Sequence, residues 1–430
     1  SMWMTAYNRI AAANDLIDNM SKASDSKFKQ GEMERKMIYG EALAIRALLH
    51  FDMLRLFAPA PVNDDGQTYI PYITTFPEVL GAHVPVKVSL DMVIKDLEDA
   101  RELVKLYDFS PMGISANASG KARFYNNLEY GMEGYGKTEG LDEFFLGRGY
   151  RFSYWAITGL LARAYQYKAA YNASLYEKAK TLAQEVLDAK CTDDKGETSY
   201  SPFKNEDFNG FAYAQDPEQM RDVRMVGNLL LGIYRDNEAE AKLSGIEASF
   251  PREKMSPAQY SFCAVDVDGQ DIFKTAGGVD ESKDDIRCLR LLYKPINSYN
   301  ISLSTKWYVK TRDADERKRT LNIFPILRTS EMRFIIAETL ARNNEFDKAY
   351  EILNEMRRNR GLQNGDLPKH TSLDEFLKDL VREGQREWIS EGQLFYLYKR
   401  LNFAVKRDDG TFAPFKKEEC VVPLPIEELK

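Results

Sequence analysis

Two stretches of this chain repeat one helical pattern, and this repetition constrains the fold more than any other feature. In each stretch an apolar helix precedes a second helix that carries an aromatic residue, two polar residues and an alanine, as in Tyr176-Glu177-Lys178-Ala179 and Phe346-Asp347-Lys348-Ala349. A small alanine lets two antiparallel helices approach closely, while the aromatic ring fills the groove beside it. Repeated helix pairs are typical of helical-repeat proteins. The pattern therefore predicts two hairpins of the TPR type.

Helical periodicity also covers the N-terminal part of the chain. Apolar residues lie on one face from Gly31 to Phe57, and we expect the helix to end there because Pro59 disfavours helix in the residue before it. The segment from Tyr7 to Met20 has the same periodicity and is expected to pair with this helix. A third helix is predicted from about Ser89, as its N-cap, to Val104.

Two boundary signals are expected among the C-terminal helices. Three arginines between positions 357 and 360 precede Gly361, which suits the negative end of a helix followed by a left-handed cap. Ser372 and Glu375 match a capping box at the start of the next helix.

The middle of the chain differs from both ends. Residues 191–325 are rich in Gly, Asp, Asn and Ser and have no long helical pattern, and an insertion at residues 110–150 is rich in glycine and aromatic residues. Long loops within a compact domain often carry function. We predict a single, mostly α-helical domain over residues 1–430. It divides into an N-terminal helical part at 1–190, a loop-rich ligand side at 191–325 and a C-terminal helical part at 326–430.

Composition argues against several classes of protein. The net charge of -7 does not suit nucleic-acid binding, which needs clustered Lys and Arg. No apolar run approaches the roughly 20 residues of a membrane-spanning helix. The chain has only three histidines, and its four cysteines are far apart, which argues against a zinc site and predicts buried thiols, with disulfides as the alternative. These cysteines are Cys191, Cys263, Cys288 and Cys420.

No cofactor is predicted, and calcium is left open at one place. Asp266, Asp268 and Asp271 surround Gly269, but they do not follow the spacing of an EF-hand loop. We expect a polar turn there, with a bound calcium ion as the alternative.

The sequence contains no motif of a catalytic site. A P-loop, a GxSxG elbow and HExxH are absent, and the glycines at 131–136 have the wrong offsets for dinucleotide binding. The paired carboxylates of a glycosidase are brought together by the fold and cannot be recognised here. We predict a binding protein and no enzyme, with a glycoside hydrolase as an alternative.

Aromatic residues of the loop-rich region are the predicted ligand contacts. An exposed ring offers a flat face to the C–H face of a pyranose, while Asn and Asp side chains bond its hydroxyls. Trp155 and Trp388 lie at core spacing within helices and are expected to be buried. The alternative for the loop aromatics is that they pack the loops onto the scaffold. The candidate ligand-binding residues are Trp307, Tyr308, Tyr293, Tyr299, Phe208, Phe211 and Tyr213.

Motifs at both ends of the chain, taken in order, resemble the SusD/RagB family. They include the paired N-terminal helices, a helix similar to the family's "LRYAEVLLLxAEA" and an ending similar to "xPIPxxE". The residues concerned are Tyr7-Asn8-Arg9-Ile10, Glu41-Ala42, Phe51 to Phe57, Leu327 to Arg333, Ala337-Glu338, Arg357, Arg360-Gly361, Glu387, Glu391-Gly392 and Val422 to Glu428. The chain departs from the family at Leu394 and Leu397, where an Arg and an Asp are common, so we expect a divergent member.

This resemblance implies a fold, a location and a function. The fold would be a SusD-like α-α superhelix. The protein would be tethered to the outer face of a Bacteroidetes-type outer membrane by a lipid on an N-terminal segment that these residues do not include. It would capture a glycan and pass it to a TonB-dependent transporter of the SusC type. The alternatives are a peptide-binding member of the same family and a TPR scaffold for protein partners.

Overall fold

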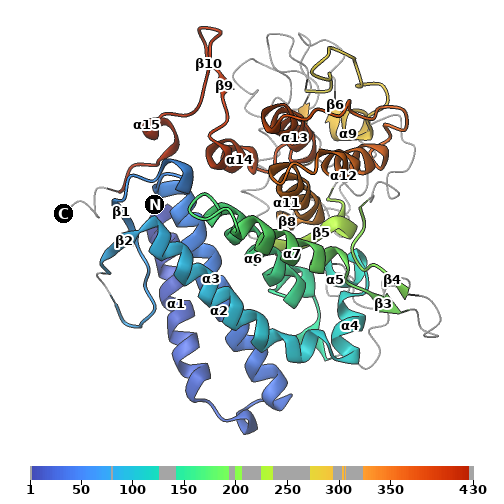
Figure 1. The fold of residues 1–430 in the computed structure, drawn as a ribbon. Coiled ribbons are helices and arrows are strands. Elements are labelled where there is room, and N and C mark those ends of the chain that lie inside the picture. The colour runs from blue at the N-terminus through green and yellow to red at the C-terminus, as the bar shows by residue number, and fades with distance from the viewer. Residues whose placement is uncertain are drawn as a thin grey trace. The chain divides into compact units, whose positions relative to one another are not determined.

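The computed structural model describes residues 2–78, 81–124, 142–192, 199–205, 224–235, 272–293, 303, 304, 306 and 323–425. These residues form mostly helices, as predicted, with short two-stranded antiparallel sheets between them (Figure 1). The chain divides into two compact units: unit 1 comprises residues 1–114, 152–186 and 393–430, and unit 2 comprises residues 115–151 and 187–392. Each unit therefore combines segments that are far apart in the sequence.

Unit 1 is built on three long N-terminal helices. Helix α2 packs against both α1 and α3, so the predicted pairing of the first two helices is confirmed. Gly40 permits the close approach of α2 to α3, because a Cβ atom there would lie 2.7 Å from Val104 Cγ1 and 2.9 Å from the Ala100 carbonyl oxygen. The helices are α1 (Met2–Lys22), α2 (Gly31–Phe57) and α3 (Val86–Asp108).

Helix α3 begins earlier than predicted. Its N-cap position is occupied by Pro85, and Ser89 lies inside the helix with its side chain fully buried. Val86 is buried together with Leu90 and Val93, so the apolar face starts before Ser89. The serine matched an N-cap by residue type, but burial of the preceding valine determined where the helix starts.

The first predicted hairpin is formed by helices α6 (Tyr154–Lys168) and α7 (Leu175–Leu187). Side chains connect the two helices in antiparallel order. The Tyr154 hydroxyl donates to Glu185 Oε1 at 2.6 Å, and Lys178 Nζ lies 5.8 Å from the centroid of the Tyr165 ring. The backbone of α6 makes its closest helix contacts with α3 rather than with α7.

The C-terminal segment of unit 1 returns to the end of α2. Lys399 Nζ donates to the carbonyl oxygens of Arg55 at 2.7 Å and Cys420 at 2.6 Å, and the Val422 amide donates to the Leu56 carbonyl oxygen at 2.9 Å. This segment contains α14 (Leu394–Leu401), β9 (Val405–Lys406), β10 (Phe412–Ala413) and α15 (Lys417–Cys420).

Unit 2 contains the second predicted hairpin, which is confirmed. Its two helices approach closely at many positions, and α13 packs against both. The predicted apolar residues of the hairpin are buried, among them Phe346, Ala349 and Leu353. The helices are α11 (Thr329–Arg342), α12 (Phe346–Arg358) and α13 (Leu373–Glu387).

One of the two predicted boundary signals is wrong. Gly361 has the expected left-handed backbone, with φ of 95°. Ser372 occupies the N-cap of α13, but its side chain makes no capping hydrogen bond. Glu375 instead accepts a hydrogen bond from Lys378 Nζ at 2.8 Å, because a lysine three residues later offers a charged partner.

The other described elements of unit 2 are short. The strands β5 and β8 pair antiparallel, with Tyr234 opposite Ile323. Among the residues that the structure describes, no helix is both long and apolar enough to span a membrane. Helix α4 (Pro111–Asn117) begins in unit 1 and ends in unit 2. The other elements are α5 (Gly120–Phe124), β3 (Cys191–Thr192), β4 (Ser199–Tyr200), β5 (Leu229–Tyr234), α9 (Ile286–Leu291), β6 (Leu292–Tyr293), β7 (Leu303–Ser304) and β8 (Ile323–Arg328).

Side-chain burial tests the predicted tryptophans and cysteines. Trp388 is buried, as predicted, whereas Trp155 is only half-buried. Cys191, Cys288 and Cys420 are buried, and Cys263 lies outside the described residues.

Candidate functional site

Most of the predicted ligand contacts lie outside the described residues. This holds for Trp307, Tyr308, Tyr299, Phe208, Phe211 and Tyr213, and also for the aspartates of the possible calcium turn at 266–271. Tyr293 is described only through its backbone, which pairs with Leu303 across β6 and β7. The assignment of these residues therefore stays a prediction. The described residues next to these segments, however, meet in one buried charge network of unit 2.

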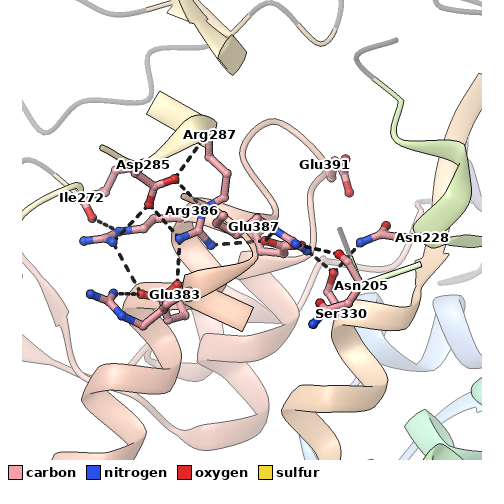
Figure 2. A network of polar contacts seen from close by, with 12 residues as sticks. Asn205, Asn228, Ile272, Asp285, Arg287, Ser330, Glu383, Arg386, Glu387 and Glu391 are labelled. Carbon is pink, nitrogen blue, oxygen red and sulfur yellow. Dashed lines mark hydrogen bonds and ion pairs between the residues drawn. The ribbon is translucent and has the colours of Figure 1, made fainter. Parts of the chain in front are cut away.

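The centre of this network is a pair of glutamates on α13. Glu383 accepts a hydrogen bond from Arg287 Nη2 at 2.9 Å and another from Arg357 Nη1. Glu387, one helical turn later, accepts from Arg360 Nη2 at 2.6 Å and from Arg287 Nη1 at 3.2 Å (Figure 2). All five side chains are at most 2% exposed. The charged face of α13 therefore points into the protein.

A second group of contacts attaches the segment at 272–293 to α13. Arg386 Nη1 donates to Glu281 Oε2 at 2.7 Å. Arg386 Nε donates to the Ile272 carbonyl oxygen at 2.7 Å (Figure 2). Asp285 accepts from Arg287 Nε at 2.9 Å and Nη2 at 2.8 Å, and it also caps α9 by accepting from the Arg287 amide. Ile272 is the residue at which the described chain resumes after the gap at 236–271.

Glu391 extends the network beyond the end of α13. It accepts from Arg328 Nε at 2.8 Å and Nη2 at 2.7 Å, and from Lys306 Nζ at 2.8 Å. Lys306 is 1% exposed, and its carbonyl oxygen accepts a hydrogen bond from Arg224 Nη1. Because Lys306 directly precedes Trp307, the network holds the chain next to the foremost candidate ligand residue.

The network also holds both ends of the segment that contains Phe208, Phe211 and Tyr213. Arg360 Nη1 donates to the Asn205 carbonyl oxygen at 2.6 Å, and Arg328 Nη1 donates to the Arg224 carbonyl oxygen at 2.8 Å. The described chain stops at Asn205 and resumes at Arg224. The buried network therefore fixes the backbone on both sides of this predicted ligand segment.

The electrostatics of the network suit anchoring rather than proton transfer. Burial by itself raises the pKa of Glu383, but the guanidinium groups of Arg287, Arg386 and Arg357 outweigh burial and lower that pKa to about 2. Burial opposes Arg328 and Lys306 in the same way at Glu391, whose pKa is lowered to about 2. The pKa of Glu387 is also held well below its ordinary range, against burial, chiefly by Arg360. These three carboxylates stay ionised at neutral pH and have no proton to donate.

Sequence reasoning missed this network, although it named several members. Arg357 and Arg360 were assigned to a helix C-terminus, where contact with solvent would be expected, but both are fully buried. The signal was the four-residue spacing of Glu383, Glu387 and Glu391, the first two of which lie on the same side of α13 as buried Leu380. Buried charge is rare unless it is paired, so acids on an apolar face predict arginine partners.

Metal binding finds no support in the described part of the chain. It contains no group of three or more His, Cys, Asp or Glu side chains that could hold a metal ion. The acids of the network are occupied by guanidinium and ammonium partners.

Two family models match the sequence. A SusD-like model, described as "Starch-binding associating with outer membrane", matches residues 1–125, and a SusD/RagB model, described as "SusD family", matches residues 293–419. None of the curated proteins matches the sequence. The two matched ranges include α1–α3 and most of the network.

Solved structures match the whole length of the chain. A SusD superfamily protein from Bacteroides vulgatus has a TM-score of 0.66 at 18% identity, covering 100% of this chain and 82% of that one. A SusD superfamily protein from Bacteroides thetaiotaomicron has a TM-score of 0.64 at 19% identity, with 99% and 83% coverage. Surface glycan-binding protein A from Bacteroides uniformis has a TM-score of 0.60 at 14% identity, with 100% and 82% coverage. The fold is therefore shared, and together with the two family models it makes this chain a divergent member of the SusD/RagB family.

Proposed function

We propose that this protein captures a glycan at the outer face of the outer membrane and passes it to a SusC-type TonB-dependent transporter without chemical conversion. The observation that carries the proposal is that family models match both ends of the chain. The model that matches the N-terminal end is described as starch-binding and associated with the outer membrane. Similar structures from Bacteroides vulgatus and Bacteroides uniformis are named as carbohydrate- or glycan-binding proteins. A lipid on a preceding segment would tether the protein to the membrane.

The buried network gives a physical reason why such a site would bind well. It fixes Asn205, Arg224 and Lys306, which border segments that contain candidate aromatic residues, and Ile272, which borders the segment at 236–271. Binding costs less conformational entropy where the surrounding backbone is already held in place. Trp307 follows Lys306 directly, so its backbone starts from a fixed point. We propose Trp307 and the other six aromatic candidates as the stacking surface.

The electrostatics support binding without catalysis. A glycosidase needs one carboxylic acid that keeps its proton near neutral pH, close to a second, ionised carboxylate. Glu383, Glu387 and Glu391 are instead held ionised by arginine and lysine partners. The network therefore acts as scaffold for the binding segments.

Affinity electrophoresis through gels that contain different polysaccharides tests the glycan assignment. We expect one polymer to retard the protein, with no release of reducing sugar, and chelation of divalent cations to leave the retardation unchanged. Trp307→Ala should weaken binding about tenfold, the scale of one lost stacking face. Phe412→Ala, which removes a phenylalanine that is 58% exposed in unit 1, serves as the matched control and should bind like the wild type. Binding to peptides but to no polysaccharide would identify the protein as a peptide-binding member of the family. Release of reducing sugar would contradict the non-catalytic role.

Transfer to a transporter is tested separately by affinity purification from outer membranes. We expect a TonB-dependent transporter to co-purify with the lipidated protein. Recovery of the protein without any such transporter would contradict the transfer step while leaving glycan capture intact.

A further inference from the structure

We propose that Phe109 and Trp155 in unit 1 form a second stacking position for a pyranose unit of the captured glycan. This inference rests on the proposed function, because the ligand must be a glycan chain. Phe109 is the C-cap residue of α3, and Trp155 lies in the first turn of α6, the helix that packs against α3 (Figure 1). The apolar periodicity of α6 predicted that Trp155 would be buried, but its side chain is partly exposed.

The backbone beneath the two rings is held in place. Asp108 Oδ2 accepts a hydrogen bond from the Tyr154 amide at 2.7 Å, so the last residue of α3 satisfies a free N–H group at the start of α6. Ser153 Oγ accepts from the Ala156 amide at 3.2 Å in the same turn. Asp108 and Tyr154 are 2% and 3% exposed. The rings are therefore positioned before any ligand arrives, which lowers the entropic cost of binding.

The rings themselves form a shallow, partly exposed surface. Phe109 is 47% exposed, and its plane is inclined by 35° to that of Trp155, with 5.6 Å between the ring centroids. Tyr154 stands nearly perpendicular to both rings, at 87° to Phe109 and 88° to Trp155, and supports them from the buried side. Leu106, which is 41% exposed, extends the apolar surface along α3.

Polar groups beside the rings favour a sugar over a protein partner. Arg101 Nη2 donates to both carboxylate oxygens of Glu185, at 2.6 and 2.8 Å, and Glu185 is 34% exposed. Lys105 Nζ lies over the Phe109 ring, 5.8 Å from its centroid, on a side chain that is 48% exposed. Charged residues are depleted at the centres of protein interfaces, where they would lose their hydration. Donors and acceptors beside an aromatic face match the hydroxyls and the C–H face of a pyranose.

The test compares the binding of the retarding polysaccharide to the wild type and to four variants by isothermal titration calorimetry. We expect Phe109→Ala and Phe109→Leu to weaken polymer binding about twofold to tenfold, because both remove the ring. Phe109→Tyr should retain the wild-type affinity, as should Phe412→Ala. Phe109→Leu keeps an apolar side chain on the helix end and so guards against a folding defect in Phe109→Ala.

Each outcome bears on one of the two proposals. Wild-type affinity in both Phe109→Ala and Phe109→Leu, in a protein that binds the polymer and loses affinity on Trp307→Ala, would overturn the second stacking position alone. A wild type that binds no glycan in solution would overturn the proposed function, and this inference with it. A loss of affinity in Phe412→Ala equal to that in Phe109→Ala would also overturn the inference, because the effect would not be specific to the site.

Discussion

The two helical hairpins of this protein share one sequence pattern but are stabilised in different ways. In unit 1, Glu185 on α7 is 34% exposed and accepts hydrogen bonds from Tyr154 on α6 and from Arg101 on α3, which is 18% exposed. In unit 2, the backbones of α11 and α12 approach closely, and α13 adds charged pairs such as Arg360–Glu387 that are at most 1% exposed. The charged contacts of the first hairpin are therefore partly exposed to solvent, whereas those beside the second are buried.

This difference shows that an aromatic-x-x-alanine pattern determines helix pairing but not the role of the hairpin. The role depends on what the next helix contributes. Behind α12, the helix α13 supplies Glu383 and Glu387, and their arginine partners hold segments more than 90 residues away in sequence. Four predictions test this difference between the hairpins, and they are given in order of decreasing effect.

Acid should unfold unit 2 before unit 1. The pKa values of Glu383 and Glu391 are about 2 in the folded protein, below the ordinary 4.5, so the unfolded chain binds more protons as the pH falls. Their contribution to stability is therefore fully present above about pH 4.5 and is lost as the pH falls towards 2. Digestion with pepsin at stepwise lower pH should give its first cleavages in unit 2. Earlier cleavage within α1–α3 would contradict the prediction that unit 2 is the first to unfold in acid.

Removing one acid from the centre of the network should be the most damaging single substitution considered. Glu387→Ala leaves Arg360 and Arg287 buried without this partner, which should lower the free energy of unfolding by about 3–5 kcal/mol. Glu355→Ala is the matched control, because Glu355 is 52% exposed and lies 3.9 Å from Arg333. It should change stability by less than about 1 kcal/mol. Equal effects in urea unfolding would show that the network contributes no more than a surface pair.

The closeness of the helices can be tested by overpacking both hairpins. Ala349 and Ala179 are equally buried, at 0% exposure, in the same position of the repeated pattern. Ala349→Trp should destabilise the protein by about 1–3 kcal/mol or more, because α11 and α12 leave little room between their backbones. Ala179→Trp should cost less, since α6 and α7 are farther apart. Thermal melting distinguishes the two variants. A larger effect at Ala179 would show that the helices of the first hairpin, and not those of the second, are the more closely packed.

The smallest effect is expected at the surface contact of the first hairpin. Glu185→Gln removes the charge that faces Arg101 but keeps an acceptor for the Tyr154 hydroxyl. We expect a change in unfolding free energy below about 1 kcal/mol, because partly exposed ion pairs are screened by water and salt. Urea unfolding at low and high salt measures it. A loss comparable to that of Glu387→Ala would show that both hairpins depend on charge to the same extent.

The sequence predicted the helical scaffold well because helix formation depends on local residue patterns. The apolar face from Gly31 to Phe57 and the stop before Pro59 gave the bounds of α2 without any tertiary information. Local patterns were less reliable for helix ends, since Ser89 lies inside α3 and Ser372 occupies the N-cap of α13 without making a capping hydrogen bond. The apolar spacing around Trp155 predicted burial, yet this residue lies at the start of α6, where its side chain is only partly buried.

By itself the sequence determined the helical class, both hairpins and membership of the SusD/RagB family, because these depend on residue order along the chain. Only the tertiary structure showed that Arg287, Arg328, Arg357, Arg360 and Arg386 are buried and paired with five acids. Several of these pairs join residues 63 to 105 positions apart, such as Arg328 with Glu391 and Arg386 with Glu281. From sequence alone a charged residue is expected at the surface, because charged residues are rarely buried without a partner. The partner of a buried charge can be far away in sequence and is placed beside it only by the fold.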